Sequence, residues 1–554
     1  MIENKVVPSE NFDQLKNLLA SLGTPALASH FGANRCEILE SLGADIISST
    51  LAEAVALQEG ASVFRKASIR RNLLDRVNED RLRSFYQFDQ LDENVLDEIN
   101  RFSWGNNPKT KTFLNLFELS GEIFDEDAST SENEIDSVTP PSLLHPYQNW
   151  IRKDLLRFLI GDRKKRALVH MPTGSGKTRT CMEALCDAIR NTRHPAFTVV
   201  WMAHSEELCE QAVQTFEAQW RKLGSTSVNL IRLWGGRQVQ EFDESSVNFV
   251  VTSFQTAYSM TRSPIADRFL LFSAIKRSCE FLVVDEAHQS TAPTYQEAIE
   301  LFSNNATKLV GLTATPGRSR VAEDGSATEE LAAFYNQNKI NIVGNDGRSL
   351  ENPIRFLQQQ QILSEIDHKI WGGTDIELTD AERRIIEDSL DVPKTVLDRV
   401  ALDHERTARI VTNTMAIAVQ EKKQTILFAP SKENAVDIAL VLKLRGCAAR
   451  AVTSDTSPSE RRRYIEQFKS GEIRVLTNFG VLTTGFDAPN TEAVVIARPT
   501  NSVVLYSQMI GRGLRGVNMG GTPECLIVDV NDNIVNLPNV HDAFMHFDEF
   551  YLGG

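Results

Sequence analysis

Two series of short apolar runs, separated by stretches with helical spacing, constrain the fold of this 554-residue chain. The first series is RALVH, FTVVWMA, VNFVVTS, FLVVDEA and KLVGLTA, within residues 166–314. The second is QTILFAP, AARAVTS, IRVLTNF, AVVIARP and CLIVDV, within residues 424–530. Strands that are apolar throughout are buried on both faces, which is typical of parallel sheets covered by helices. The pattern therefore predicts an α/β fold with two tandem domains, each built on a parallel sheet.

The N-terminal part of the chain has a different spacing of apolar residues. Segments such as NFDQLKNLLASL and SSTLAEAVALQEG place apolar residues at helical spacing, which predicts a mostly α-helical N-terminal domain. An acidic, Ser/Thr-rich stretch ending at Pro140–Pro141 follows and is typical of a linker, although an acidic surface loop is the alternative. We expect a helical accessory domain over 1–120, an acidic linker over 121–141, one α/β domain over 142–340, a connecting segment over 341–395 and a second α/β domain over 396–554.

Composition and charge exclude several classes of protein. Apolar residues make up 42% and charged residues 24%, as in ordinary globular proteins. The net charge of −15 argues against a basic tail that coats nucleic acid or an anionic membrane, but a local positive track is compatible with it. No apolar stretch reaches the length of a membrane span, and the start of the chain has no signal-peptide pattern. The seven cysteines are scattered, so we expect free thiols in a cytoplasmic protein without a membrane partner.

The segment HMPTGSGKT follows one apolar run and precedes a helical stretch. Strand, glycine-rich loop and helix in this order form a phosphate-binding loop, in which backbone N–H groups and the helix N-terminus face the phosphates. Lys177 would reach the β- and γ-phosphates, and the Thr178 hydroxyl would bind Mg²⁺. Met171 stands where the usual pattern has glycine, and a plain glycine-rich turn is the alternative interpretation.

A pair of carboxylates ends another apolar run, in FLVVDEAH. The carboxyl end of a parallel strand faces the same crevice as the phosphate loop, so Asp285 would bind Mg²⁺ and Glu286 would orient and deprotonate the attacking water. Alone, such a pair could be the acidic first turn of a helix. In GLTATP, the hydroxyls of Thr313 and Thr315 could sense the state of this segment, or could simply close a turn.

Two further pairs of residues complete a candidate nucleotide site. Tyr147 and Gln148 precede the loop, and a glutamine amide can both donate to and accept from an adenine edge. Arg512 and Arg515 are three residues apart, so on a helix they would share a face and could neutralise charge on the γ-phosphate. Asp487, in TTGFDAPN, is available for a ribose hydroxyl. The alternatives are a polar helix residue for Gln148 and a solvated basic helix for the arginines.

The ordered motifs resemble those of superfamily 2 helicases, in the DEAH-containing branch that includes type III restriction motor subunits and related DNA translocases. The resemblance covers about residues 143–530 and rests on YQ, MPTGSGKT, VVWMAHSEELCEQA, VVTSFQT, VVDEAH, LTATP, TILFAPS, LTNFGVLTTGFDAPN and QMIGRGLR, in that order. Within this group, methionine is a tolerated variant at position 171.

The resemblance implies two RecA-like domains that close on ATP and Mg²⁺. It implies that catalysis depends on Lys177, Asp285, Glu286, Gln508, Arg512 and Arg515, and that Thr178 and Asp285 bind the metal. The other ATP contacts would be Tyr147, Gln148, Thr173, Gly174, Ser175, Gly176, Lys177, Thr178, Gly485 and Asp487. Nucleic-acid phosphates would contact His204, Ser205, Thr252, Gln255, Thr256, Ser431 and Thr483, unless these side chains only cap helices. His288, Thr313 and Thr315 would couple the two sites.

The expected function is that of an ATP-dependent nucleic-acid helicase or translocase. Gln508 and Met509 stand where RNA-acting DEAD-box proteins have histidine and arginine, which favours DNA over RNA. An RNA helicase, translocation without unwinding, and an ATP-gated recognition or scaffold subunit stay open, with the helical N-terminal region as the docking site for a partner protein. We find no acid–acid–lysine nuclease constellation, so cleavage would need a separate subunit, as in a bacterial DNA-processing or phage-defence complex.

Overall fold

A computed structural model describes most of the chain, which forms two compact units. The described residues are 10–86, 88, 92–105, 107–119, 143–161, 164–192, 194–237, 242–262, 266–315, 326–388, 391–482 and 488–534. The first unit comprises Met1–Pro140, Ala401–Ala416 and Val436–Arg450, and the second comprises Pro141–Val400, Ile417–Ala435 and Ala451–Gly554. The acidic linker predicted over 121–141 lies outside the described residues.

The first sheet confirms the predicted parallel architecture. Its strands are in the order β3-β4-β2-β5-β6-β1-β7, and all its pairs are parallel. Five of the strands coincide with the five apolar runs. No run matches β3, an edge strand that is fully buried only at Leu233, or β7, which has two residues. The bounds are β1 Arg166–His170, β2 Phe197–Ala203, β3 Asn229–Leu233, β4 Val247–Ser253, β5 Cys279–Asp285, β6 Lys308–Thr313 and β7 Lys339–Ile340.

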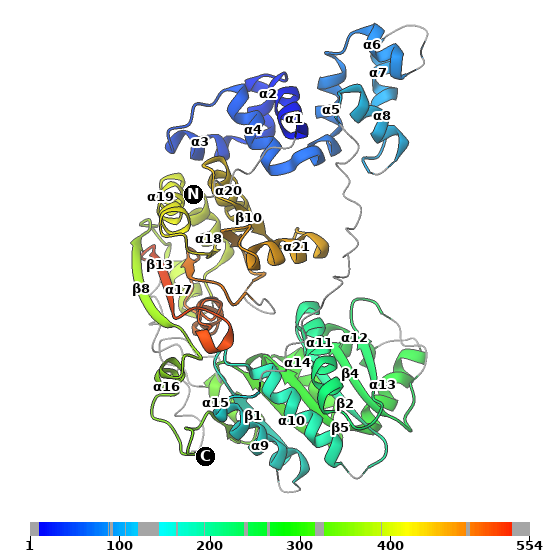
Figure 1. Ribbon diagram of the computed structural model, residues 1–554, viewed down its shortest axis with the longest axis vertical. Coiled ribbons are helices and arrows are strands. Elements are labelled where there is room, and N and C mark those ends of the chain that lie inside the picture. The colour runs from blue at the N-terminus through cyan, green and yellow to red at the C-terminus, as the bar shows by residue number, and fades with distance from the viewer. Residues whose placement is uncertain are drawn as a thin grey trace, which may run out of the picture. The chain divides into compact units, whose positions relative to one another are not determined.

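Alternating residues of this sheet pack against two layers of helices. On β1, for example, Val169 belongs to a core shared with the first three helices below, and Leu168 to a core shared with the other four. Such burial of both faces explains why the strands are apolar at every position. The helices, visible in Figure 1, are α9 Pro146–Ile160, α10 Lys177–Asn191, α11 Glu206–Leu223, α12 Phe254–Thr261, α13 Ala266–Ser278, α14 Pro293–Phe302 and α15 Ser326–Phe334.

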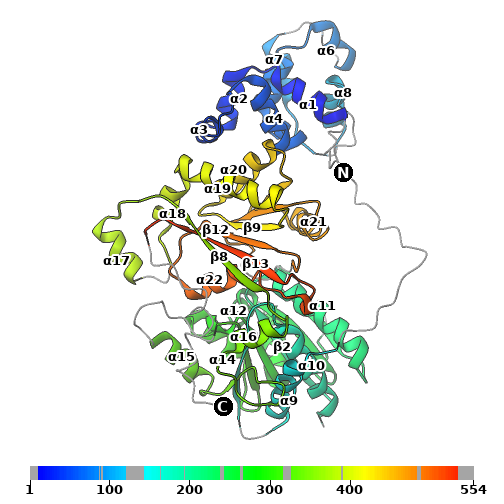
Figure 2. The same ribbon diagram turned by 60° about the vertical axis from the view of Figure 1, so that its left-hand side comes forward.

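The second sheet contains one strand that lies within the segment expected to connect the domains. Its order is β10-β11-β9-β12-β13-β8, and β8 pairs in parallel with all eight residues of β13 at the edge (Figure 2). The sequence of β8, EIDHKIWG, is polar and largely exposed, so a search for apolar runs misses it. The bounds are β8 Glu365–Gly372, β9 Thr425–Phe428, β10 Ala449–Val452, β11 Val475–Asn478, β12 Ala493–Ile496 and β13 Glu524–Asn531.

Seven helices accompany this part of the described chain. Within the connecting segment, α16 precedes β8 and α17 follows it, and α18 begins at the end of that segment. Figure 2 shows α21 near β9, and α22 near β13. The bounds are α16 Pro353–Gln359, α17 Asp380–Asp388, α18 Lys394–Ala401, α19 His404–Met415, α20 Lys432–Leu444, α21 Pro458–Lys469 and α22 Val503–Ile510.

The N-terminal region is helical, as predicted, and in the first unit it packs against α19 and α20. The Arg35 guanidinium donates to the carboxylate of Asp437, which is only 3% exposed, over 2.5 Å. Glu37 pairs with His404 over 2.6 Å. Among the described residues no helix is both long and apolar enough to cross a bilayer. The helices are α1 Glu10–Ala20, α2 Thr24–Phe31, α3 Ala33–Ser41, α4 Ser48–Glu59, α5 Ala67–Leu74, α6 Glu79–Phe85, α7 Glu93–Asn100 and α8 Pro108–Leu116.

Candidate active site

Three neighbouring strands of the first sheet deliver their motifs to one edge. The order β5-β6-β1 places the glycine-rich loop after β1, the carboxylate pair at the end of β5 and the Thr313 segment at the end of β6. His170 is in register with Thr313, and Asp285 with Leu312. Because parallel strands end at the same edge of a sheet, the phosphate loop and the carboxylates meet there.

The loop itself has the backbone geometry that a phosphate-binding loop needs. Gly174 has a φ of 85° and Gly176 a φ of 83°, a left-handed region in which glycine avoids the steric cost of a side chain. Two side chains of α9 hold the turn: the Tyr147 hydroxyl and the Gln148 amide donate to the Ser175 carbonyl over 2.7 and 2.9 Å. The adenine contact of Gln148 stays a prediction, since in this structure its amide contacts the loop.

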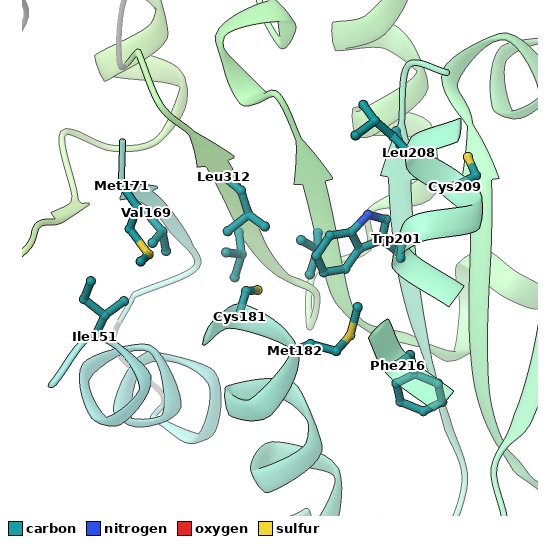
Figure 3. Packing of buried hydrophobic residues seen from close by; sticks show 14 of the residues in the cluster. Ile151, Val169, Met171, Cys181, Met182, Trp201, Leu208, Cys209, Phe216 and Leu312 are labelled. Carbon is teal, nitrogen blue, oxygen red and sulfur yellow. The ribbon is translucent and has the colours of Figure 1, made fainter. Parts of the chain in front are cut away.

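Met171 belongs to the hydrophobic core rather than to the phosphate-facing part of the loop. Its side chain is fully buried and lies beside Val169, with Ile151 of α9 nearby (Figure 3). Its backbone N–H donates to the Thr313 carbonyl over 3.1 Å, which extends the β1–β6 pairing by one residue. The methionine therefore fills space between α9 and the sheet at the position where other phosphate loops have glycine.

Glu286 is the centre of a charged cluster beside the loop. Lys177 Nζ lies 3.6 Å from Glu286 Oε1, and His288 Nδ1 lies 3.5 Å from Oε2. The Glu286 backbone has φ and ψ of 52°, a left-handed conformation that is uncommon for a residue other than glycine. Its N–H donates to Asp285 Oδ1 over 3.0 Å. Strain of this kind persists where the surroundings fix a side chain, and it occurs often at catalytic positions.

Burial and charge affect the two carboxyl groups in opposite directions. For Asp285, burial and the neighbouring Glu286 outweigh Lys177 and raise the pKa to about 6. For Glu286, burial raises the pKa, but Lys177, His288, His204 and Arg512 together lower it below its usual value. At neutral pH, two buried carboxylates thus lie next to each other, with Lys177 and Arg512 as the permanent cations acting on Glu286 and Lys177 as the one acting on Asp285. A buried carboxylate of this kind suits a divalent cation that substrate phosphates accompany.

The residues present fit Mg²⁺ accompanied by a nucleotide. Within the described ranges, no three His, Cys, Asp or Glu side chains form a ready-made metal cluster. Mg²⁺ does not need one, because it commonly binds one or two carboxylates together with substrate phosphates. Thr178, in the first turn of α10, and the buried Asp285 are the groups available for that role.

A continuous set of contacts leads from Glu286 to the end of β6. The Thr313 hydroxyl lies 3.4 Å from His288 Nδ1 and 2.8 Å from the Thr315 carbonyl, and it accepts from the Thr315 N–H over 3.1 Å. All three side chains are buried. The coupling role predicted for His288, Thr313 and Thr315 stays a prediction, but these contacts give it a physical route.

The two predicted arginines do not share a helix face, which corrects the sequence-based expectation. Helix α22 ends at Ile510, Arg512 lies in the following turn, and Arg515 forms an isolated antiparallel bridge with Leu363. Gly511 follows the end of the helix, and a Cβ there would lie 2.5 Å from that of Thr173. Close packing against the phosphate loop therefore requires glycine immediately before Arg512.

Both arginines nevertheless lie near the predicted nucleotide site. The charge of Arg512 is one of those that lower the pKa of Glu286. Arg515 Cγ would lie 3.3 Å from a Cβ placed on Gly174 of the loop. Gln508, on α22, is 9% exposed. The loop after α22 thus brings its cations to the loop after β1.

Several hydroxyls predicted to contact nucleic acid are engaged within the protein. The Ser205 hydroxyl caps α11 by accepting from the Leu208 N–H over 3.3 Å, and Ser431 accepts from the Asn434 N–H at the start of α20 over 3.0 Å. Thr252 is fully buried and donates to the Leu233 carbonyl over 2.9 Å, so its side chain is not available to a phosphate. For these three hydroxyls, the geometry matches the alternative expectation, in which they cap helices or bond at strand ends.

The remaining candidates differ in exposure. Gln255 is exposed and donates to the His204 carbonyl over 3.4 Å, whereas Thr256 contacts the Ser253 hydroxyl that caps α12. His204 follows β2 as Glu286 follows β5, and both Glu286 and Glu207 act on its pKa, which burial lowers overall. Thr483, Gly485 and Asp487 lie outside the described residues.

One turn that is a candidate for contact with nucleic acid, WGGR after β3, was not among the residues predicted from the sequence. Gly235 and Gly236 have φ values of 62° and 77°, and the Arg237 guanidinium lies 4.7 Å from the centre of the Trp234 ring. A Cβ on Gly235 would lie 3.0 Å from a carboxylate oxygen of Glu206, so the turn adjoins the start of α11. Two adjacent glycines directly after a strand were the signal that could have found it.

Comparison with known proteins identifies two family domains. Residues 142–318 match the family described as "Type III restriction enzyme, res subunit", and residues 407–517 match "Helicase conserved C-terminal domain". The "Putative ATP-dependent helicase IRC3" of Saccharomyces cerevisiae is 28% identical over 63% of this chain and 46% of its own length. The "Putative mitochondrial ATP-dependent helicase irc3" of Schizosaccharomyces pombe is 24% identical over 71% of this chain and 58% of its own.

The match therefore spans about half the length of these curated relatives. Among solved structures, the "ATP-dependent Type ISP restriction-modification enzyme LlaBIII bound to DNA" is 16% identical, with a TM-score of 0.48. That alignment covers 74% of this chain and 30% of the other.

Proposed function

Because the chain belongs to the superfamily 2 helicases, ATP-hydrolysing enzymes related to restriction motor subunits, we propose that it couples ATP hydrolysis to movement along DNA. One observation supports the proposal most directly. Glu286 is held in a strained left-handed conformation between Lys177, 3.6 Å away, and His288, 3.5 Å away, beside the phosphate loop. A strained, largely buried carboxylate with cationic neighbours suits the activation of a water molecule.

We assign the first-domain residues as follows. The loop backbone from Thr173 to Gly176 and the Lys177 ammonium bind the triphosphate of ATP. Thr178 and Asp285 hold Mg²⁺, which when bound would neutralise charge on the β- and γ-phosphates. Glu286 orients the attacking water and accepts a proton from it, and it is ionised at neutral pH, since its pKa lies below the usual value for glutamate.

The second-domain residues complete the site. Arg512 and Arg515 neutralise the charge that develops on the γ-phosphate, and such arginines are worth about 10³–10⁵ in rate. Gln508, close to them on α22, is assigned to the same phosphate or to the attacking water. The proximity of Arg515 to Gly174 and of Gly511 to Thr173 supports this assignment.

Two features support DNA rather than RNA as the track. Met509 is fully buried in the core, where RNA-acting DEAD-box proteins carry an arginine, and Gln508 replaces their histidine. The first family domain bears the name of a restriction enzyme subunit. Phosphates would lie against the exposed Gln255, the nearby Thr256 and the glycine turn at Gly235–Gly236, because glycines let a backbone approach closely.

The test is the ATPase rate against a panel of single- and double-stranded DNA and RNA. We expect stimulation by DNA, loss of activity in Lys177→Ala and Glu286→Gln, and retained ATP binding in Glu286→Gln. Glu297→Gln is a matched control, since Glu297 belongs to an exposed pair with Arg262 in the same domain. No dependence on any nucleic acid, or full activity in Lys177→Ala, would refute the proposal.

The N-terminal region is the proposed docking site for a partner protein, and an ATP-gated recognition subunit is the second candidate function. Deleting residues 1–135 would be a poor test, because it would uncover the buried Asp437 that pairs with Arg35. Charge reversals at exposed positions on α6 and α7, with association measured directly, avoid that defect. The cytoplasmic location and the setting in a DNA-processing or phage-defence complex stay predictions.

A further inference from the structure

A short segment between α16 and β8 is hydrogen-bonded to the loop that carries the arginines. Ser364, the last residue before β8, is fully buried, and its hydroxyl lies 2.6 Å from the Arg515 carbonyl and 2.7 Å from the Thr522 carbonyl. Its N–H donates to the Leu514 carbonyl over 3.1 Å. One serine thus fixes the backbone on both sides of Arg515.

The residues before Ser364 add further bonds to the same loop. The N–H of Gly516 donates to the Ile362 carbonyl and that of Asn518 to the Gln361 carbonyl, each over 2.9 Å. The Asn518 amide also donates to the Gln360 carbonyl over 2.8 Å. A Cβ on Gly516 would lie 2.7 Å from the carbonyl carbon of Gln361, so this approach requires glycine.

Strand β8 makes a second attachment, to the helix that precedes the arginines. Asp529 of β13 is 1% exposed, and one of its oxygens, Oδ2, lies 2.6 Å from His368 Nε2 on β8 and accepts from the Tyr506 hydroxyl of α22 over 2.8 Å. Burial raises the pKa of Asp529, while His368 and Tyr506 oppose that rise. Tyr506 is two residues before Gln508, so the buried carboxylate ties α22 to β8.

We propose that residues 360–372, here called the connector, position the arginine loop (residues 511–518) for ATP hydrolysis, with Ser364 and His368 as the positioning residues. The connector comes after β7, an edge strand of the first sheet, and after α16. Its last eight residues form β8, an edge strand of the second sheet. A movement of one domain against the other therefore acts on the segment that is bonded to Leu514, Arg515 and Gly516. The inference rests on the proposed roles of Arg512 and Arg515.

The connector would affect the rate of hydrolysis by holding the arginines in position. The connector bonds to the backbone around Arg515 and, through Asp529, to α22, whereas no described side chain of the connector is assigned a phosphate contact. Removing a connector bond should displace the arginines without removing a group that binds ATP. A misplacement of about 1 Å at a reacting centre can cost about 10² in rate. The loss should therefore appear in kcat and leave ATP affinity nearly unchanged.

The variants are Ser364→Ala, His368→Leu and His368→Gln, in the full chain. Glutamine keeps a donor at the position of the imidazole, and leucine does not. Ser303→Ala is the control, because it removes a serine hydroxyl that donates to a helix carbonyl over 2.8 Å in the first domain. The readouts are DNA-stimulated kcat, ATP affinity with a non-hydrolysable analogue, and the melting temperature.

We expect Ser364→Ala and His368→Leu to lower kcat by about 10²-fold, with ATP affinity within about threefold of the native protein. His368→Gln should recover most of the rate, and Ser303→Ala should match the native kcat. In an Arg512→Ala/Arg515→Ala background, Ser364→Ala should cause no further loss, because a positioning residue acts through the groups it positions. A purely structural role predicts additive losses in that cycle and would overturn the proposal.

The same experiment separates this inference from the proposed function. Native activity in both Arg512→Ala and Arg515→Ala would remove the arginines from the active site, and the connector would then have nothing to position. Loss of activity in those variants, with native kcat in Ser364→Ala and His368→Leu, would refute the connector alone. If Ser364→Ala does not fold, the comparison of His368→Leu with His368→Gln decides the question.

Discussion

Replacing Met171 by glycine restores the common phosphate-loop pattern and should nevertheless damage the protein. From the sequence alone, glycine at this position would be expected to be neutral or to improve the loop. In the structure, the methionine side chain is fully buried beside Val169 and Ile151, and only its backbone contacts Thr313. The substitution therefore removes core packing and adds nothing to the phosphate-binding turn, whose left-handed glycines are at 174 and 176.

The expected loss follows from the volume removed. Truncating a buried methionine to alanine costs about 2–5 kcal/mol, because the cavity collapses only in part. The extra backbone freedom of glycine in the unfolded chain adds about 0.5–1 kcal/mol. A total of about 2.5–6 kcal/mol is a large fraction of the 5–15 kcal/mol that stabilises a typical domain. Met171→Leu, which nearly conserves volume, should cost less than about 1.5 kcal/mol.

Urea unfolding followed by tryptophan fluorescence measures the effect, since Trp201 lies in the same core cluster. The shift of the midpoint multiplied by the slope gives the change in free energy of unfolding. ATP affinity is then compared for the folded native, Met171→Gly and Met171→Leu proteins. An unchanged midpoint in Met171→Gly, an equal loss in Met171→Leu, or tighter ATP binding in Met171→Gly would refute the reasoning.

Three further predictions concern other parts of the chain. Ser205→Ala should cost about 1 kcal/mol of stability by removing the cap of α11, and Ser205→Asp should restore the cap; equal DNA affinity in both variants would exclude a phosphate contact. Burial, with Arg450 nearby, lowers the pKa of Lys443 to about 7, so the native protein loses stability as the pH falls from the usual lysine range to 7. The melting temperature of Lys443→Met minus that of the native protein should therefore rise as the pH falls over that interval and level off below it. A difference that stays constant with pH would contradict the shift. Gly235→Ala, at a φ of 62°, should cost about 1–2 kcal/mol of backbone strain and weaken DNA binding in a salt titration, with basal ATPase unchanged; unaltered DNA affinity would remove this turn from the proposed track.

Much of the fold and of the candidate ATP site could be predicted from local pattern. Apolar runs at β1, β2, β4, β5 and β6 are long enough and pure enough to identify a parallel sheet. The motifs at Lys177 and Glu286 follow two of those runs, and strands that end at one edge bring them together. The structure places these side chains 3.6 Å apart, a distance that no spacing in the sequence could supply.

The serine and threonine candidates show a case in which the local sequence pattern cannot distinguish two roles. A serine or threonine at a strand end serves equally well as a helix cap or as a phosphate ligand, and the sequence is identical in both cases. Only the orientation of each side chain distinguishes them, and Ser205, Ser431 and Thr252 are bonded within the protein. Strand β8 was missed for a related reason, since an exposed edge strand does not need apolar residues.

The sequence by itself determined the α/β architecture, the helical N-terminal region and the chemistry available at the ATP site, because these depend on periodicity and on short contiguous motifs. Tertiary structure alone decided what Met171 does, where Arg512 and Arg515 lie after α22 ends, and that residues 360–372 are bonded to the arginine loop. The attachment of the connector to the arginine loop depends on packing between segments that are about 150 residues apart, such as Ser364 with Arg515. The order of residues along the chain does not show which distant segments pack together.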